Sequence, residues 1–231
     1  SMPASPQISI VLPILNEEAY ITACLGALQA LRDQNCELIV VDGGSHDRSV
    51  ALAKPLADRV VVSAKGRSTQ MNAGARQASG DIFWFLHADS QPPSDASHVI
   101  RAALTQPEHC WGRFDVRLSG YRPSLRMVEF SMNLRSRLTG IATGDQGIFV
   151  RRKLFERIGG YPPIGLMEDI ALSRVLKRHS RPVCLRQCIL SSSRRWERDG
   201  VARTILLMWR LRLAYFLGAD PDGLARIYYR S

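Results

Sequence analysis

The chain has 231 residues, of which 45% are hydrophobic and 23% charged, which is typical of a globular protein with a sizeable core. No uncharged apolar run reaches the roughly 18 residues of a membrane span, and the N-terminus lacks the charged and then apolar pattern of a signal peptide. The five cysteines are scattered and odd in number, which favours a reduced, cytoplasmic protein over a disulfide framework.

The formal net charge of +10 points to an anionic partner. Nucleic acid, an anionic membrane surface and a phosphorylated small substrate are three classes of partner that match this charge. The arginines concentrate in residues 113–137 and 174–212, and no nucleic-acid module signature or regular interleaving of aromatic residues accompanies them. We therefore expect no nucleic-acid partner.

The first strand is expected at residues 8–12, a short apolar run of β type. Asn16 is predicted to cap a helix that carries acids in its first turn and ends near Leu31. A second buried strand at residues 37–41 ends in Asp42, and two glycines then allow a tight turn before the next helix.

A third strand at residues 59–63 leads through Arg67 into a helix that contains Asn72, and a fourth strand follows at residues 82–86. Strand and helix therefore alternate four times, which predicts a parallel sheet with right-handed crossovers. Acidic or basic side chains recur after the strands, and the carboxyl ends of parallel strands are where ligands collect. This recurrence predicts a site at that edge of the sheet.

The fourth strand is followed directly by His87, Ala88 and Asp89. On an extended backbone His87 and Asp89 would point the same way, because side chains two residues apart share a face. Such a pair suits a hard divalent cation that bridges the protein to a substrate diphosphate. The alternative is that Asp89 only caps a helix beginning near Ser94. The residues alone leave both interpretations open.

Three of these segments resemble the N-terminal signatures of inverting family-2 glycosyltransferases with the GT-A fold. They are VLPILNEE at residues 11–18, VDGGSHD at residues 41–47 and LHAD at residues 86–89. The resemblance extends over nearly the whole chain and is strongest to a small bacterial subgroup, the rSAM/selenodomain-associated glycosyltransferases.

The resemblance implies an α/β fold, a GT-A-like single domain at residues 7–231 with a mainly parallel central sheet flanked by helices. Residues 7–108 would form the nucleotide-sugar-binding half and residues 109–231 the acceptor half. The site residues that we predict for the nucleotide sugar are Pro13, Asn16, Glu17, Asp42, Arg67, Asn72, His87, Ala88, Asp89, Asp145, Gln146, Arg195 and Trp196.

The resemblance also assigns roles to three of these residues. Asp42 would hydrogen-bond the base, Arg67 would lie near the base or the diphosphate, and Asp89 would bind a divalent cation, Mn²⁺ or Mg²⁺. Most of the family has Asp where this chain has His87, and a neutral imidazole supplies no negative charge to a metal. This departure weakens the expected metal dependence.

The second half is expected to bind the acceptor. A strand is predicted at residues 110–118, with its charged side chains on one side, followed by a helix at residues 124–138. Gly144, Asp145 and Gln146 resemble a motif of the subgroup near the active site, and the alternative is a polar turn that needs glycine.

Glu168 and Asp169 begin a predicted helix, where acids are favoured by the helix dipole alone. They also match the family's E-D motif, in which the Asp is the catalytic base. The resemblance thus implies that Asp169, beside Glu168, accepts the proton of the acceptor hydroxyl. Both interpretations of the pair remain open at this stage.

Arg195 and Trp196 match the end of the family's Q-x-x-R-W segment, with Ser192 where Gln is usual, and Trp196 is equally compatible with a core position. A helix is predicted at residues 201–217, apolar but interrupted by three arginines. It is too short and too charged to cross a bilayer, so it is either a packed or homodimer-forming helix or an interfacial membrane helix.

We therefore expect transfer of a sugar from a nucleoside-diphosphate-sugar donor to an acceptor hydroxyl with inversion. The acceptor is unknown, with a lipid-linked one as a candidate, and the expected location is the cytoplasm, with peripheral binding to the inner membrane face as a further option. One alternative is an NDP-sugar nucleotidyltransferase, although residues 13–18 lack the usual glycine-rich loop. A catalytically silent nucleotide-binding or membrane-adaptor protein is the other.

Overall fold

The computed structural model describes residues 5–230, apart from the side chains of Arg195, Trp196 and Asp199. Its centre is an eight-stranded sheet in the order β3-β2-β1-β4-β7-β6-β8-β5. The strands of the first half are β1 (Ile8–Ile14), β2 (Cys36–Asp42), β3 (Arg59–Val62), β4 (Ile82–Phe85) and β5 (Ser90–Gln91). Because β1 pairs in parallel with β2 and β4, and β2 with β3, the predicted parallel sheet is confirmed.

Helices connect these parallel strands. They are α1 (Ile21–Arg32), α2 (Ser49–Ala53) with the short η1 (Lys54–Leu56), and α3 (Arg67–Gln77). Helix α4 (Ala96–Ala103) follows β5 and leads into the second half. The connection from each strand to a parallel neighbour requires such a crossover, which is why strand and helix alternate in this half of the sequence.

The second half completes the sheet with mixed pairing. Its strands are β6 (Trp111–Leu118), β7 (Phe149–Arg151) and β8 (Val183–Ser191). Strand β7 runs antiparallel to both β4 and β6, β8 runs parallel to β6, and β5 closes the edge antiparallel to β8. The sheet is therefore mainly parallel in its first half and mixed in its second, as mixed sheets of α/β proteins commonly are.

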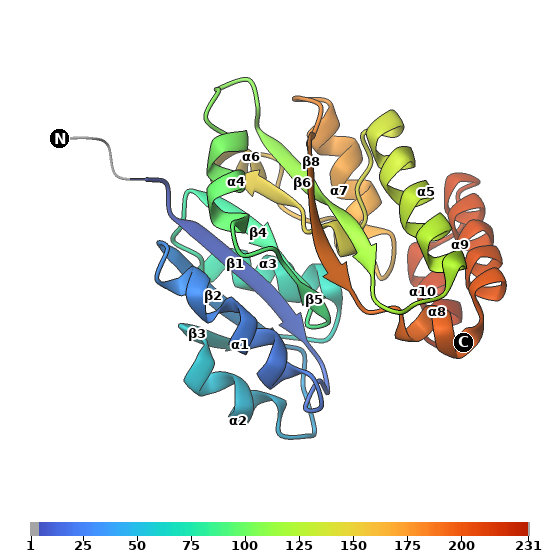
Figure 1. Cartoon of the computed structure of the whole chain (residues 1–231), viewed down its shortest axis with the longest axis horizontal. Helices are drawn as coiled ribbons and strands as arrows, with labels where there is room; N and C mark the ends of the chain where they lie inside the picture. The colour runs from blue at the N-terminus through green and yellow to red at the C-terminus, as the bar shows by residue number, and fades with distance from the viewer. Residues whose placement is uncertain (1–4, 231) are drawn as a thin grey trace.

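Five helices of the second half gather beyond β6 and β8, at the end of the molecule opposite α1 and α2 (Figure 1). They are α5 (Pro123–Thr139), α7 (Glu168–Lys177), α8 (Arg194–Asp199), α9 (Val201–Phe216) and α10 (Pro221–Arg230). The short helices η2 (Gly144–Gln146) and α6 (Arg152–Arg157) flank β7, and α6 is drawn beside α4 in Figure 1. Helix α10 had no counterpart among the predicted elements. Within residues 5–230, no helix is long and apolar enough to cross a membrane.

Two buried clusters cover the two faces of the sheet, and alternate residues of β1 divide between them. Leu12 packs in the cluster under α1, whereas Val11 packs under α3. Helix α3 approaches the sheet closely at Gly74, where a Cβ atom would lie 2.5 Å from Val11 Cγ1 and 2.7 Å from Val41 Cγ2. Glycine is therefore required at this position, and α3 carries Arg67 to the edge of the site.

Asn16 does not cap α1, which begins five residues later at Ile21. Its backbone is left-handed, with φ of 51°, and its side-chain Oδ1 accepts a hydrogen bond of 2.8 Å from the amide of His46. Asn is among the few residues that adopt this conformation readily. The predicted cap is wrong because Asn16 joins the loop after β1 to the loop after β2.

The segment after β4 is a turn, which corrects the predicted extended backbone. The amide of Ser90 donates a 3.0 Å hydrogen bond to the carbonyl of His87, a spacing typical of a β-turn. His87 is buried in this turn and Asp89 is exposed, and both line the cavity described below.

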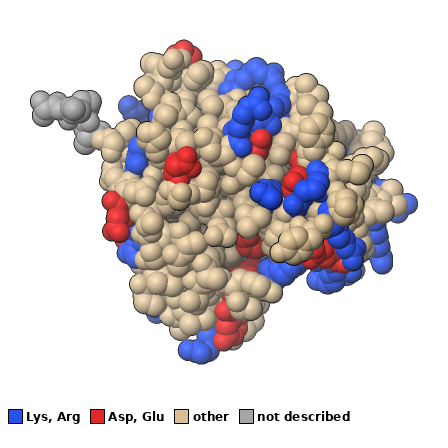
Figure 2. Space-filling model, viewed as in Figure 1, with Lys and Arg blue, Asp and Glu red and all other residues tan. Residues whose placement is uncertain are grey.

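The charge of the chain gathers on its second half. On the face drawn in Figure 2, most Lys and Arg side chains lie over the region of β6, β8, α5 and the C-terminal helices. On β6, Arg113 and Asp115 form a buried ion pair, and Arg137 of α5 approaches Asp115 to 2.8 Å. Two of the charged side chains predicted on one side of this strand, Arg113 and Asp115, thus connect β6 to α5, whereas the third, Arg117, is exposed.

Candidate active site

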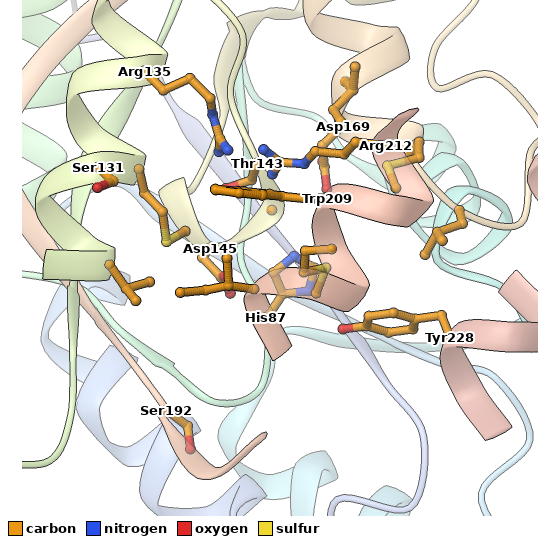
Figure 3. Close-up of a pocket in the computed structure, with 18 of the residues that line it drawn as sticks. His87, Ser131, Arg135, Thr143, Asp145, Asp169, Ser192, Trp209, Arg212 and Tyr228 are labelled. Atoms are coloured by element: carbon orange, nitrogen blue, oxygen red, sulfur yellow. The ribbon is translucent and has the colours of Figure 1, made fainter. Parts of the chain in front are cut away.

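A cavity of about 420 Å³ opens where the carboxyl end of β4 meets η2, the start of α7 and the helices α5 and α9 (Figure 3). Six of the predicted site residues line it, namely Arg67, His87, Asp89, Asp145, Glu168 and Asp169. Segments more than 80 residues apart in sequence thus meet at one cavity. The polar residues that recur after the strands predicted a site from the first half of the chain alone.

The turn at Gly144 is the point where these segments come closest. A Cβ atom there would overlap His87 Nε2 and would lie 2.7 Å from Asp169 Oδ2. Only glycine leaves room for this approach. The alternative, a polar turn that needs glycine for its backbone conformation, does not explain why residue 144 is glycine. The motif Gly144–Gln146 is a structural part of the cavity.

Asp169 is held at the base of the cavity by α7, with 8% of its surface exposed. The Tyr161 hydroxyl donates a 3.2 Å hydrogen bond to its Oδ1. Burial and the neighbouring charge of Glu168 raise the pKa of Asp169 well above its ordinary value, although Arg67 and the Tyr161 hydrogen bond act in the opposite direction. A carboxylate with a raised pKa is suited to accepting a proton near neutral pH.

Glu168 is also buried, with 4% of its surface exposed, and lines the same cavity. Desolvation raises its pKa, and the charge of Arg67 partly offsets that effect. A helix-dipole role alone would leave both acids free to face solvent, where the N-terminal dipole still stabilises them. Burial of both side chains against a cavity favours a role in the site.

His87 is a neutral imidazole in this environment. Burial and then the positive charge of Arg67 lower its pKa to about 3. It is 8% exposed and stands against the Gly144 turn. At physiological pH it therefore supplies hydrogen-bonding nitrogen atoms to the cavity and no charge.

Asp89 forms the centre of a second acidic group, which lies after β1 and β4. Desolvation and then the charge of Asp89 raise the pKa of both Glu17 and Asp145. The Asp145 carboxylate also accepts a 3.1 Å hydrogen bond from Ser191 Oγ. A carboxylate that raises the pKa of its neighbours lies close to them without sufficient positive charge, and a cation relieves that repulsion.

The number of protein ligands available to a divalent cation here is small. Among the side chains that the structure describes, no three of His, Cys, Asp or Glu come together as a metal-binding cluster. Mg²⁺, however, commonly uses one or two protein carboxylates and takes its other ligands from water and substrate phosphates. Asp89 and Asp145 fit that second pattern.

Other predicted residues lie outside the cavity lining and serve the loops around it. The Asp42 carboxylate is 3% exposed and accepts hydrogen bonds of 3.0 Å from the amides of Gly44 and Ser45. Pro13 is buried in β1 and Ala88 in the turn after β4. Asp42 therefore shapes the turn after β2 from within.

Asn72 and Gln146 are structural links. The Asn72 amide accepts a 2.9 Å hydrogen bond from the Tyr161 amide and donates another of 2.9 Å to its carbonyl. Gln146 is 1% exposed, and its Oε1 accepts a 3.1 Å hydrogen bond from the amide of Thr143. Asn72 thus positions the backbone of the tyrosine whose hydroxyl holds Asp169. The side chains of Arg195 and Trp196 lie outside the described residues.

The opposite wall of the cavity comes from α5 and α9 and was missed. Its members include Met127, Met132, Arg135, Met208, Trp209 and Arg212. The arginines of this wall are visible in the sequence as charged residues within apolar helices. Arg135 belongs to the helical spacing of residues 124–138, and Arg212 is one of the three arginines that interrupt residues 201–217. Nothing in that spacing says which helix faces which, because the pairing of α5 with α9 depends on the tertiary packing of Val128 against Val201 and Ile205.

The family described as "Glycosyl transferase family 2" matches residues 9–159. A relative from Mycobacterium bovis, "PGL/p-HBAD biosynthesis glycosyltransferase", is 30% identical over 174 residues, which cover 68% of this chain and 64% of the relative. The "Probable glycosyltransferase YdaM" of Bacillus subtilis is 25% identical over 197 residues, covering 75% of this chain and 47% of the relative. The chain spans less than two thirds of the length of these relatives.

Solved structures agree with this match at the level of the fold. S. aureus TarS in complex with UDP-GlcNAc has a TM-score of 0.64 at 18% identity, covering 80% of this chain and 58% of that chain. The mannosyltransferase PcManGT from Pyrobaculum calidifontis, in complex with GDP-Man and Mn²⁺, has a TM-score of 0.64 at 19% identity, covering 92% and 62%. These similarities bear out the GT-A-like fold.

Proposed function

The chain belongs to glycosyl transferase family 2, and we propose that it transfers a sugar from a nucleoside-diphosphate-sugar donor to an acceptor hydroxyl with inversion. The observation that carries the proposal is the buried Asp169, which faces the same cavity as the strand-end Asp89. One acid is placed for the acceptor and the other for the donor. The proposed domain is residues 7–231, with a donor half at 7–108 and an acceptor half at 109–231.

Asp169 acts as the general base in this proposal. The acceptor oxygen attacks the anomeric carbon, the bond from that carbon to the diphosphate oxygen breaks, and the hydroxyl proton moves to the Asp169 carboxylate. Attack from the face opposite the leaving group inverts the anomeric centre. The raised pKa of Asp169 supports this role, because a base is most effective when its pKa is near the working pH.

The donor side follows from the loops after β1, β2 and β4. Pro13, Asn16, Glu17, Asp42, Asn72, Ala88, Gln146, Arg195 and Trp196 are proposed to surround the nucleotide sugar, directly or by holding these loops, together with the residues of the cavity. Arg67 stands among the acids and stabilises negative charge on the leaving diphosphate. His87 donates or accepts a hydrogen bond there as a neutral group.

Mn²⁺ or Mg²⁺ is the proposed cofactor, held by Asp89 with Asp145 nearby. When bound, such an ion neutralises charge that develops on the diphosphate. The Pyrobaculum neighbour carries Mn²⁺ in its complex, which supports a cation in this fold. The neutral His87 in place of the usual acid is expected to weaken metal affinity.

The two alternatives are less well supported. A nucleotidyltransferase does not need a buried base beside the acceptor helices, and the family match favours glycosyl transfer. A silent binding protein would have no use for two buried carboxyl groups with raised pKa values, which cost stability at neutral pH. Within the family, the placement of the Gly144 turn beside Asp169 supports the rSAM/selenodomain-associated subgroup.

We propose that the protein is cytoplasmic and binds the inner membrane face peripherally. The exposed surfaces of α5 and α9 support the membrane contact. Their exposed apolar side chains are Met127, Phe130, Leu134 and Leu138 on α5, and Leu206, Trp209, Leu213 and Phe216 on α9. Arginines stand among them, which suits a surface of anionic lipid where a lipid-linked acceptor would be found. We call this surface the α5–α9 face. A homodimer is the other arrangement that would cover it.

The first prediction concerns Asp169→Asn. The amide cannot accept the hydroxyl proton, so turnover should fall by about 10²- to 10⁴-fold, the usual contribution of a general base. Nucleotide affinity, measured by titration calorimetry, should stay within about twofold. Asp95→Asn, an exposed position on the far side at α4, serves as the matched control. Normal turnover in Asp169→Asn, or a joint loss of nucleotide binding, would contradict the assignment.

The same variant should not be less stable. Because the folded-state pKa of Asp169 is raised, stability is greatest below the ordinary Asp pKa of about 3.9 and falls as pH rises toward the folded-state value. At pH 7 the Asn variant removes that cost and keeps the oxygen that binds Tyr161. Its Tm should equal or exceed that of the parent, so a lost turnover cannot be attributed to unfolding.

The second prediction concerns Asp89→Asn. Removing the carboxylate should abolish the gain in UDP or GDP affinity that Mn²⁺ produces, while the fold stays intact because the side chain is exposed. Thermal shift with each nucleotide, with and without Mn²⁺, measures this. The reverse change, His87→Asp, should tighten Mn²⁺ binding. Equal Mn²⁺ stimulation in parent and Asp89→Asn would remove Asp89 from the metal site.

The third prediction concerns the α5–α9 face. Co-sedimentation with vesicles should rise with the fraction of anionic lipid and fall with salt, because the arginines act through screened charge. Trp209→Ser should weaken this binding, whereas Val62→Ser on β3, with 70% of its surface exposed, should not. Equal binding to neutral and anionic vesicles, or no binding at all, would contradict the membrane role and favour a homodimer that covers the α5–α9 face.

A further inference from the structure

Two arginines of the acceptor half lack a partner among the side chains that the structure describes. Arg135 of α5 and Arg212 of α9 both line the cavity, and Figure 3 shows their guanidinium groups pointing toward one another. Neither side chain makes an ion pair or hydrogen bond with the described residues, which leave out the side chains of Arg195, Trp196 and Asp199. Two like charges directed at the same space repel one another, and an anion between them removes that repulsion.

The surroundings of Arg135 make this arrangement costly. Burial lowers the pKa of Arg135, and no carboxylate acts against that effect. Arg113 and Arg137, which belong to the same two layers, both have Asp115 as a partner. A half-buried guanidinium without a counter-charge is therefore an exception in this part of the molecule, and a ligand is the natural source of the missing charge.

This pair is distinct from the cations on the donor side. Arg194 and Arg67 are the positive charges that act on Glu17, and Arg67 is the one that acts on Asp145. Neither Arg135 nor Arg212 is among them. The two arginines instead share their wall with Met127, Met132 and Met208. The pair thus has apolar side chains beside it and lies on the acceptor side of the cavity.

We propose that Arg135 and Arg212 bind a phosphate group of the acceptor, with the apolar wall beside it receiving the carbon chain next to that phosphate. Guanidinium groups bind phosphate oxygens through paired hydrogen bonds, so two of them fix both the position and the orientation of the group. The acceptor hydroxyl is thereby directed to Asp169. This inference rests on the proposed glycosyl transfer and names the chemical class of its acceptor. A soluble phosphate ester and a lipid phosphate share this chemistry.

The test uses decyl phosphate as the probe, titrated into the full chain by calorimetry below the concentration at which the probe forms micelles. Arg135→Met and Arg212→Met keep the apolar volume and should each weaken binding by about 10- to 100-fold, as expected for losing hydrogen bonds to a charged group. Arg203→Met, an exposed position on α9, is the matched control and should bind as the parent does. Arg135→Lys should lose less than Arg135→Met, because it keeps the charge.

Two further measurements decide the outcome. Decyl glucoside, which has the same chain and no charge, should bind more weakly than decyl phosphate and should not respond to Arg135→Met. If the two probes bind alike, or if Arg67→Met and not Arg135→Met weakens decyl phosphate, the proposal is overturned. Competition by glycerol phosphate would indicate a soluble acceptor, and competition only by vesicles with phosphatidic acid would indicate a lipid; both outcomes support the phosphate site.

These results are independent of the transfer reaction. Binding of decyl phosphate requires neither donor nor turnover, so a chain that failed to transfer a sugar would still show or lack the phosphate site. Conversely, Arg135→Met should keep the parent's affinity for UDP or GDP, because the donor side has its own arginines. A loss of nucleotide affinity in Arg135→Met would assign the arginine to the donor and overturn the inference.

Discussion

The contact between the Gly144 turn and its two neighbours holds the cavity together. Gly144 has no Cβ atom, and such an atom would overlap His87 and crowd Asp169. The turn after α5 can therefore lie against both the end of β4 and the start of α7. This approach joins the first half of the chain, which supplies His87, to the second half, which supplies Asp169. The rest of the site follows from it, since the turn also carries Asp145 toward Asp89. A larger residue at this position would push the turn away from both neighbours and so separate the two halves of the chain.

Charge in the cavity is divided between two walls. In addition to burial, Asp89 raises the pKa of Glu17 and Asp145, and Glu168 raises that of Asp169. Arg67 is the cation that acts to lower the pKa of all three of these shifted acids. The wall made by α5 and α9 is apolar and carries only positive charge among its ionisable side chains, on Arg135 and Arg212. Desolvation makes both arrangements unfavourable in the absence of ligands, which is the expected property of a binding site. Arg135 and Arg212 thus place part of the chain's net positive charge in the wall of the cavity.

The sequence predicted the first half of the fold well because each feature there is local. Buried strands in α/β proteins are continuous apolar runs, and the turn residues after them are visible as such. The predicted Asn16 cap failed because its side chain bonds to a loop 30 residues away. The acids of α7 were identified through the family motif, whereas their burial was not predictable from spacing. Arg135 and Arg212 were out of reach for the same reason, since their positions depend on how α5 and α9 pack together.

The dependence of turnover on pH tests the central claim, that the buried Asp169 is the base. The carboxylate must be ionised to accept a proton, and its pKa is raised, so turnover should fall as pH decreases at values above the ordinary Asp pKa of about 3.9. Tyr161→Phe removes a hydrogen bond that favours the charged form, so it should move this acidic limb to higher pH. An acidic limb at the ordinary value that Tyr161→Phe leaves in place would contradict the account.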